Sequence, residues 1–414
     1  MKVYPGSLVA SPRGGGNQDG KSNAQATRTL AMMKEGMTVD YKARLRRLQS
    51  AMEDTKIDSI VYGTGSSFQY FSGVIIPWQR DEGPEEPTCF LLVTREGDAR
   101  ILLDGEHTEV VGDTFLACDT ADTRQEQIAW LRKYLLGGCV GTGRKSAPML
   151  KQLVSEALGS VECVDGERLA EALRVCKEPE EIALLRKVAS INDRVMEDLI
   201  EHIRPGTTAP QLQDLIAQLG RSHGAQGLSF PGTALFVKSG TEPSPDPFVY
   251  PREEGLVPGT SVAFDFGYLL EGYCSDYGRS FYCGEAPAHI TGAYQALQEA
   301  QCHLISQMKP YQMKINEMFG VLEAALDERG YGDRLRARLA DGTLGHQIGV
   351  DVHENPWIKP QSDVYLRPGM VMALEPKVWL PGEYYLRVED IVLITEEGAE
   401  SFTTFDRNLF ALPV

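Results

Sequence analysis

Acidic residues interrupt four hydrophobic runs in the second half of the chain. They are Asp265 in SVAFDFG, Asp276 in YCSDYGRSFY, Glu375 in VMALEPKVW and Glu389 in YLRVEDIVLIT. Burying an ionised carboxylate costs several kcal/mol, so such a group persists inside a strand only when it is paired, hydrogen-bonded or bound to a metal. The four acids therefore indicate either structural carboxylates, each satisfied separately, or a shared site for cations.

Two histidines complete this candidate set. His346 and His353 lie in LGHQIGVDVHENP. Asp276 follows Asp265 by 11 positions, a spacing that suits the two strands of a hairpin that turns near 271–273. Taken singly, each position favours a structural role, because buried acids are often satisfied by backbone N–H groups. Together, several carboxylates and one imidazole form a hard, oxygen-rich set that suits pairs of Mn, Fe, Co or Zn ions acting on a polarised carbonyl.

The elements that must position these residues fall into two blocks. In the first block, apolar residues at helical spacing from Tyr41 to Met52 predict an amphipathic helix. Short apolar runs then alternate with helical stretches, which predicts an α/β fold. The predicted strands are 57–62, 89–94 and 99–103, and the predicted helices are 123–136 and 147–158.

The second block begins near Lys177. Its pattern predicts a long helix over 180–203, ended by Arg204-Pro205-Gly206, and a second helix over 210–219. The later strand-like runs are 233–238, 260–268, 279–283, 371–378 and 386–395, with a helical block over about 291–340. This block reads as α+β with an antiparallel sheet. We therefore predict a leader over 1–35, an α/β domain over 36–176 and a second domain over 177–414.

The composition limits the partners and the compartment. The 414 residues include 58 acidic and 41 basic side chains, and the formal net charge of −17 repels nucleic acids and anionic membranes. No stretch in the first 28 residues is long and apolar enough for a signal-peptide core, and no run of 18 apolar residues occurs. The eight cysteines form no CxxC pair. We therefore expect reduced thiols, a cytoplasmic location, and neither nucleic acid nor membrane as a partner.

The motifs around these acids and histidines resemble those of the pita-bread metallohydrolases, which include prolidase, aminopeptidase P, methionine aminopeptidase and creatinase. In order they read FDFG, SDYGRSF, LGHQIGVDVHENP, LEP and RVED. YKARLRRLQSAM and QYFSG resemble an amino-terminal domain that methionine aminopeptidase lacks. The resemblance covers almost all of 40–414. It implies an α/β amino-terminal domain of the creatinase/prolidase type, an α+β pita-bread catalytic domain over 177–414, a homodimer, and a small-molecule or short-peptide substrate.

The same resemblance implies a role for each candidate ligand. Five residues would hold two divalent metal ions, with Mn, Co, Fe and Zn all open as their identity. Asp265 would chelate one ion, His346 would ligate the other, and Asp276 and Glu389 would bridge both. Glu375 would ligate the second ion and would also act as the general base for the attacking water.

Other positions match family residues around the metals. His353 matches the residue that hydrogen-bonds the substrate carbonyl and stabilises its oxyanion. Arg387 matches an arginine beside the site, where contact with substrate and pairing with a neighbouring acid are equally open. Trp78 and Arg80 lie where the amino-terminal domain can reach a neighbouring subunit's active site, with core packing the simpler role for Trp78.

The chain departs from the family pattern at one position. In the peptidases and in creatinase, a further histidine stands about 17 or 18 residues before the first metal aspartate and contacts the substrate's amide or leaving nitrogen. Here no histidine occurs between His223 and His289, and Pro247 or Phe248 stands in that place. Removing one positioned proton donor or hydrogen-bond partner typically costs about 10²- to 10⁴-fold in rate.

Three functions therefore stay open. The leading one is an Xaa-Pro dipeptidase or aminopeptidase in which Asp246, Tyr250 or a water replaces the histidine. The second is a creatinase-like hydrolase of a small non-peptide amide, or a lyase like the one acting on dimethylsulfoniopropionate, although Gly267 stands where that lyase has an extra metal aspartate. The third is a non-catalytic binding module, which the presence of all five ligand positions disfavours.

Overall fold

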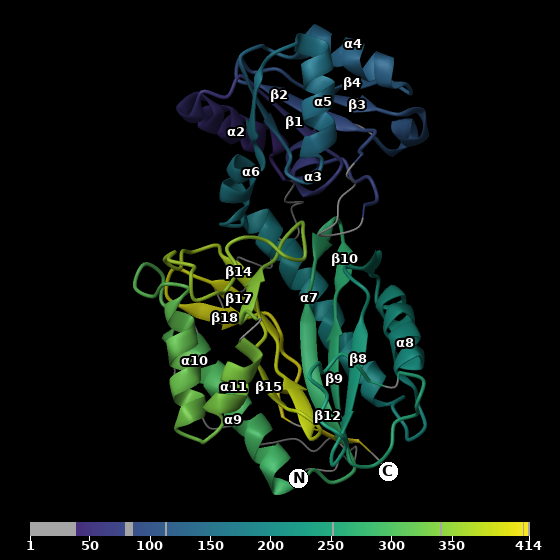
Figure 1. Cartoon of the computed structure of the whole chain (residues 1–414), viewed down its shortest axis with the longest axis vertical. Coiled ribbons are helices and arrows are strands. Elements are labelled where there is room, and N and C mark those ends of the chain that lie inside the picture. The colour runs from purple at the N-terminus through teal and green to yellow at the C-terminus, as the bar shows by residue number, and fades with distance from the viewer. Residues whose placement is uncertain are drawn as a thin grey trace, which may run out of the picture. The chain divides into compact units, whose positions relative to one another are not determined.

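The structure is a computed structural model of the whole chain (Figure 1), and it describes residues 39–78, 86–111, 114–250, 252–339, 342–408 and 410–412. The leader predicted over 1–35 and the candidate residue Arg80 lie outside the described residues. Within the described ranges, no helix combines the length and the apolar character needed to cross a membrane.

The first part of the chain folds around a six-stranded mixed sheet with the order β4-β3-β2-β1-β5-β6 (Figure 1). The strands are β1 (Ser59–Gly63), β2 (Phe90–Thr94), β3 (Ala99–Leu103), β4 (Ala117–Thr120), β5 (Cys139–Thr142) and β6 (Glu162–Asp165). The helices are α2 (Tyr41–Thr55), α3 (Ser66–Ser72), α4 (Arg124–Tyr134), α5 (Ala147–Leu158) and α6 (Glu167–Arg174), with a 3₁₀ turn at Gly105–Val111. β1 pairs antiparallel with β2 and parallel with β5.

Alternation along these strands divides the apolar core into two layers. Ile60 and Leu91 share a core with Leu48 of α2, whereas Val61 shares a core with Leu150 of α5. Successive side chains of a strand point to opposite faces of the sheet. Helices therefore cover both faces, as the α/β pattern of the sequence predicts.

The second part contains two four-stranded sheets, each backed by helices (Figure 1). Their orders are β19-β12-β9-β8 and β13-β14-β17-β18, beside a β15-β16 hairpin and a β11-β10-β7 sheet. The first strands are β7 (Gly227–Leu228), β8 (Thr233–Lys238), β9 (Thr260–Phe266), β10 (Tyr268–Leu270), β11 (Tyr273–Cys274), β12 (Tyr277–Cys283) and β13 (Gly345–Gln347). The last are β14 (Val371–Leu374), β15 (Lys377–Leu380), β16 (Tyr384–Arg387), β17 (Asp390–Ile394), β18 (Ala399–Ser401) and β19 (Phe410–Leu412).

Helices bury one face of each four-stranded sheet. They are α7 (Pro179–Ile200), α8 (Ala209–Ser222), α9 (Ala288–Gln307), α10 (Glu317–Asp327) and α11 (Gly332–Leu339). Ile216 of α8 shares a core with Phe264 of β9, and Leu297 of α9 shares a core with Val392 of β17. Because Phe264 faces the helices, the neighbouring Asp265 points to the opposite face of the sheet.

The run 260–268 divides into β9 and β10 at Gly267, and two further runs that we predicted as single strands are also broken in the structure. The run 371–378 divides into β14 and β15 at Glu375-Pro376, and the run 386–395 divides into β16 and β17 at Val388-Glu389. Proline lacks the backbone N–H that a strand needs for its ladder, which accounts for the break at Glu375-Pro376. As a result, Glu375 and Glu389 both lie at strand ends.

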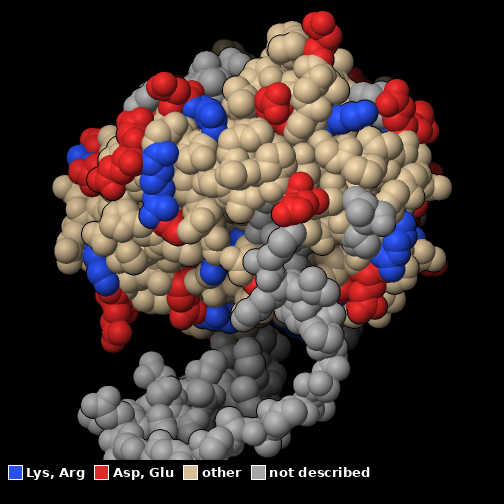
Figure 2. Space-filling view, turned by 90° about the horizontal axis from the view of Figure 1, so that it is seen from below, with Lys and Arg blue, Asp and Glu red and all other residues tan. Residues whose placement is uncertain are grey.

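The molecular face in Figure 2 carries Asp and Glu side chains dispersed among Lys and Arg. The charges of the acidic chain are thus spread over many places on that face.

Candidate metal centre

The four acids predicted from the sequence come from both four-stranded sheets and meet at one place. Asp265 lies in β9 opposite Gly278 of β12, and Gly278 also forms an isolated bridge with Glu389. Asp276 directly precedes β12, and Glu375 directly follows β14. We call Asp265, Asp276, Glu375 and Glu389 the acid cluster.

Gly278 makes this convergence possible. A Cβ at this position would lie 2.4 Å from Cδ of Arg387, 2.7 Å from a carboxylate oxygen of Glu389 and 2.9 Å from the carbonyl oxygen of Phe264. Real Cβ atoms do not approach other atoms so closely, so a larger residue would displace the site. Reasoning from the sequence missed Gly278, although a glycine inside a strand is a recognised sign of close approach.

Three carboxylates of the acid cluster lie within reach of one cation. One oxygen each from Asp265, Asp276 and Glu389 lie within 4.8 Å of one another. Asp276 Oδ1 and Glu389 Oε1 are buried and accept no hydrogen bond from the described residues. Buried acceptors without donors are costly, and a divalent cation would satisfy both oxygens. This donor set therefore fits a hard metal ion.

The carboxyl groups of the acid cluster differ in their acidity. Burial raises the pKa of Asp276 and of Glu389 well above the usual carboxyl range, and the neighbouring carboxylates raise both further. Burial also acts to raise the pKa of Glu375, but Lys377 and Arg387 outweigh it and lower that pKa to about 2. Glu375 thus stays ionised more readily than Asp276 or Glu389.

His346 lies at the edge of the acid cluster, in β13. Its Nε2 is 3.4 Å from Asp276 Oδ2 and 3.9 Å from Glu375 Oε1. Its Nδ1 is 3.0 Å from the backbone oxygen of Gln347. A proton on Nδ1 that is donated to this carbonyl leaves the lone pair on Nε2, facing the acids. Ligating histidines are commonly oriented in this way.

His353 lies beside His346, in a more exposed position. The two ring centroids are 4.3 Å apart and the rings are perpendicular. The ring of Trp357 lies 5.3 Å from that of His346 and 5.0 Å from that of His353. His346 is buried and His353 is exposed. An exposed imidazole at this place can contact a molecule that arrives from solvent.

Two buried cations face the acid cluster. Arg387 Nη1 pairs with Asp265 and lies 3.2 Å from Glu389, and its Nη2 lies 3.6 Å from Glu375. Of the two roles left open for Arg387, pairing with acids is the one seen here. Lys377 pairs with Glu375 and is the cross-strand partner of Arg387. Sequence reasoning missed Lys377, whose signal was a lysine inside the hydrophobic run after Glu375.

Comparison with known proteins decides the family. Residues 183–396, which are 214 of the 414 residues, match the family described as Metallopeptidase family M24. The chain belongs to metallopeptidase family M24. Residues 44–176 match the Creatinase/Prolidase N-terminal domain.

Named relatives of this M24 protein include peptidases. A putative dipeptidase of Bacillus subtilis is 30% identical over 259 residues, which are 63% of this chain and 69% of that protein. An Xaa-Pro dipeptidase from Bacillus anthracis matches with a TM-score of 0.76 and 25% identity, over 90% of this chain and 100% of the other. A prolidase from Pyrococcus horikoshii matches with a TM-score of 0.76 and 22% identity, over 89% and 99%. These matches confirm the predicted family and fold class, and the M24 protein is a hydrolase.

The M24 protein uses both suggested replacements for the missing histidine in local contacts. Tyr250 donates its hydroxyl hydrogen to the backbone oxygen of Ala234 at 2.7 Å. Asp246 is exposed and accepts a hydrogen bond from the backbone N–H of Phe248 at 2.9 Å. The Phe248 ring packs against Tyr385 with centroids 5.9 Å apart. Among the described contacts, neither Asp246 nor Tyr250 hydrogen-bonds to the acid cluster.

Trp78 packs against the apolar core that contains Leu48 and Ile60. It also lines a cavity of about 210 Å³ together with Arg174 and His353. Core packing, the simpler of the two predicted roles, is thus seen for Trp78. Its reach into a neighbouring subunit stays a prediction.

Proposed function

We propose that this M24 enzyme hydrolyses small amide substrates at a centre of two divalent metal ions, with Xaa-Pro peptides as the leading class. The observation that carries the proposal is the convergence of the acid cluster with His346 around carboxylate oxygens that a cation would satisfy. The structure of an Xaa-Pro dipeptidase from Bacillus anthracis is similar over 90% of this chain, and this similarity supports the substrate class.

Five residues would hold the two ions. Asp265 would bind one, His346 and Glu375 would bind the other, and Asp276 and Glu389 would bridge both. Ions bound there would polarise the substrate carbonyl and lower the pKa of water. The set accepts Mn, Co, Fe or Zn, and its majority of carboxylates favours manganese.

The protein's own side chains would perform the proton transfer and the charge stabilisation. Glu375 would accept the proton of the attacking water, and Lys377 and Arg387 would keep it ionised for that step. His353 would donate a hydrogen bond to the substrate oxygen as negative charge develops on it. The perpendicular contact with His346 would hold His353 beside the reacting carbonyl.

A second candidate is hydrolysis of a small non-peptide amide. Its support is Phe248, whose ring offers no hydrogen-bond donor to a peptide leaving group and packs against Tyr385. The lyase alternative receives no such support. A Cβ at Gly267 would lie 1.8 Å from the backbone oxygen of Ser275 and 2.3 Å from Oγ of Ser229, so the extra aspartate of that lyase does not fit.

Hydrolysis of a substrate panel tests the proposal. The panel contains Xaa-Pro dipeptides, longer Xaa-Pro peptides and creatine, and the protein is loaded with Mn, Co or Zn and its metal content measured first. Turnover of proline peptides is expected. Phe248→His should increase that turnover, and Val249→His, at a neighbouring side chain that is 71% exposed, is the matched control. A protein that carries two ions and leaves every proline peptide intact would refute the peptidase and favour the second candidate.

We also propose a cytoplasmic homodimer. Light scattering of the purified protein tests the dimer, and fractionation of the source cells tests the compartment. A monomer at the concentrations of the activity assay would refute the first of these expectations.

A further inference from the structure

Lys177 is a buried cation that lies between α6 and α7 and reaches the segment carrying both histidines. Its side chain is 1% exposed, and its Nζ lies 3.0 Å from Glu354 Oε2 and 3.3 Å from Gln347 Oε1. Its backbone N–H donates to the oxygen of Gly369 at 2.7 Å. One ammonium group thus contacts Gln347 and Glu354 at the same time.

Gln347 and Glu354 are themselves paired through the backbone. The N–H of Gln347 donates to the oxygen of Glu354 at 3.2 Å, and the N–H of Glu354 donates to the oxygen of Gln347 at 2.8 Å. Their side chains point to one side of this antiparallel bridge, toward Lys177. The residues that precede them, His346 and His353, point to the other side. The bridge therefore explains why two histidines seven positions apart have rings in contact.

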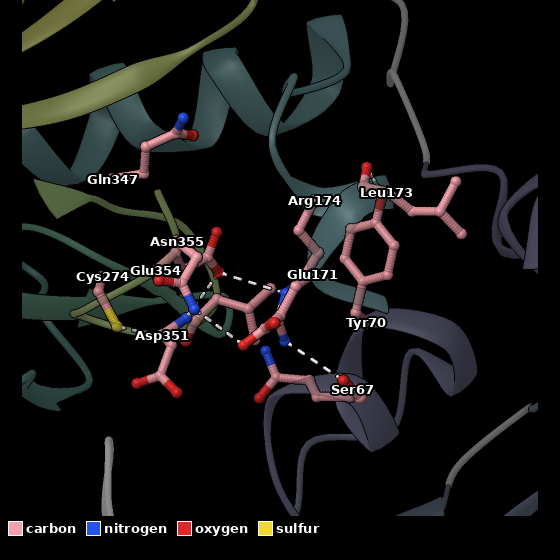
Figure 3. Close-up of polar contacts among 12 residues, drawn as sticks. Ser67, Tyr70, Glu171, Leu173, Arg174, Cys274, Gln347, Asp351, Glu354 and Asn355 are labelled. Carbon is pink, nitrogen blue, oxygen red and sulfur yellow. Dashed lines mark hydrogen bonds and ion pairs between the residues drawn. The ribbon is translucent and has the colours of Figure 1, made fainter. Parts of the chain in front are cut away.

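The carboxylate of Glu354 also contacts the segment that joins Gln347 to Glu354. Besides Lys177, it accepts a hydrogen bond from the backbone N–H of Asp351 at 3.2 Å, and Arg174 Nε lies 3.8 Å away. Figure 3 shows Arg174 directed toward both Glu354 and Ser67, with Asp351 beside Glu354. Burial acts to raise the pKa of Glu354, but Lys177 and Arg174 outweigh it and hold that pKa below its usual range.

We propose that the Lys177–Glu354 ion pair is a positioning device that sets the place of His353 relative to His346 through the 347–354 bridge. Both residues act at a distance from the reacting atoms and are positioning residues. The catalytic consequence rests on the proposed function, because it requires His353 to meet the substrate oxygen. The geometric consequence, a fixed contact between the histidine rings and Trp357, does not depend on the substrate.

Glu354→Gln keeps the size of the side chain and removes the charge that holds Lys177. We expect kcat for an Xaa-Pro dipeptide to fall at least tenfold, with KM and metal content within twofold of wild type. Trp357 emission, obtained by subtracting the spectrum of the matching Trp357→Phe protein, should change because the imidazole of His353 moves relative to the indole. Lys177→Met should lower kcat in the same way, and Lys177→Arg, which keeps the positive charge, should retain more of the kcat than Lys177→Met does.

Glu181→Gln is the matched control. Glu181 is as buried as Glu354 and pairs with Arg44 at 3.3 Å, and among the described residues its hydrogen bonds and ion pairs do not involve the 347–354 segment. It should lower the melting temperature and leave both kcat and Trp357 emission unchanged. A Glu354→Gln protein that behaves in the same way would overturn the proposal and reduce the ion pair to a stabilising contact.

Gly349→Ala covers the case in which Glu354→Gln does not fold. A Cβ at Gly349 would lie 2.9 Å from both carboxylate oxygens of Glu354, so it displaces the carboxylate while keeping its charge. The same loss of kcat and change in Trp357 emission are expected, and wild-type values for both would overturn the proposal. If the wild-type protein cleaves nothing in the panel but Trp357 emission still changes in the variants, the proposed function fails and the positioning device stands.

Discussion

Replacing Asp276 by asparagine should change the stability of the protein in opposite directions with and without metal. Asp276 is 4% exposed, and one of its oxygens lies within 4.8 Å of oxygens of Asp265 and Glu389. Asparagine keeps the shape of the side chain and removes its negative charge. The metal-free variant should be more stable than the wild type, and the metal-loaded variant should be less stable.

The structure sets the size of both effects. Two unit charges 4.8 Å apart repel each other by about 3.5 kcal/mol at an effective dielectric constant of about 20. The raised pKa values of Asp276 and Glu389 mean that protonation already relieves part of this repulsion, so we expect the metal-free variant to gain about 1–2 kcal/mol. A metal at 100 times its Kd stabilises the native state by about 2.7 kcal/mol, and the variant should lose most of this gain.

Thermal unfolding in EDTA and in excess Mn, with metal per chain measured by mass spectrometry, checks this prediction. Asp390→Asn is the control, because Asp390 is fully buried next to Glu389 but pairs with Arg279 at 2.7 Å and Arg407 at 2.6 Å. It should destabilise the protein under both conditions. If Asp276→Asn still carries two ions, or loses stability in EDTA as Asp390→Asn does, the bridging role of Asp276 is wrong.

Three further predictions concern single residues. His353→Ala should lower kcat/KM for an Xaa-Pro substrate by about 10²- to 10³-fold, and unchanged kinetics at unchanged metal content would contradict its role. Arg44→Met should lower the free energy of unfolding in urea by about 3–5 kcal/mol because it leaves the buried Glu181 without its ion-pair partner; a loss typical of an exposed pair would argue against this. Burial acts to raise the pKa of Glu354, but Lys177 and Arg174 outweigh it and lower that pKa. The ionised side chain therefore stabilises the folded protein fully above the unfolded-state pKa of about 4.3, and this stabilisation is lost as pH falls through the folded-state pKa. The stability difference between the wild type and Glu354→Gln should therefore shrink below about pH 5 in urea titrations, and a constant difference would count against it.

The composition of the acid cluster could be predicted because a charged residue inside an apolar run is rare and needs a partner. The spacing of Asp265 and Asp276 also predicted their hairpin, and β9 indeed pairs antiparallel with β12. The strand breaks beside two of the acids were missed, because periodicity continues across Glu375 and Glu389 although the hydrogen-bond ladder does not. The first of these breaks had a visible signal in Pro376.

Long-range pairs were beyond sequence reasoning. Lys177 and Glu354 are 177 positions apart, and their contact depends on how the 347–354 bridge packs on the segment between α6 and α7. Lys377 was visible as a charge in an apolar run, but only the β15–β16 pairing places it opposite Arg387. The helical block predicted over 291–340 is three helices, and Pro310 between α9 and α10 was the overlooked signal.

Anomalous diffraction from crystals soaked in manganese tests the central claim most directly. The account predicts two peaks about 3.5–4 Å apart inside the acid cluster. One should touch Asp265, the other His346, and both should lie between Asp276 and Glu389. A crystal at saturating manganese whose acid cluster holds no peak would contradict the account.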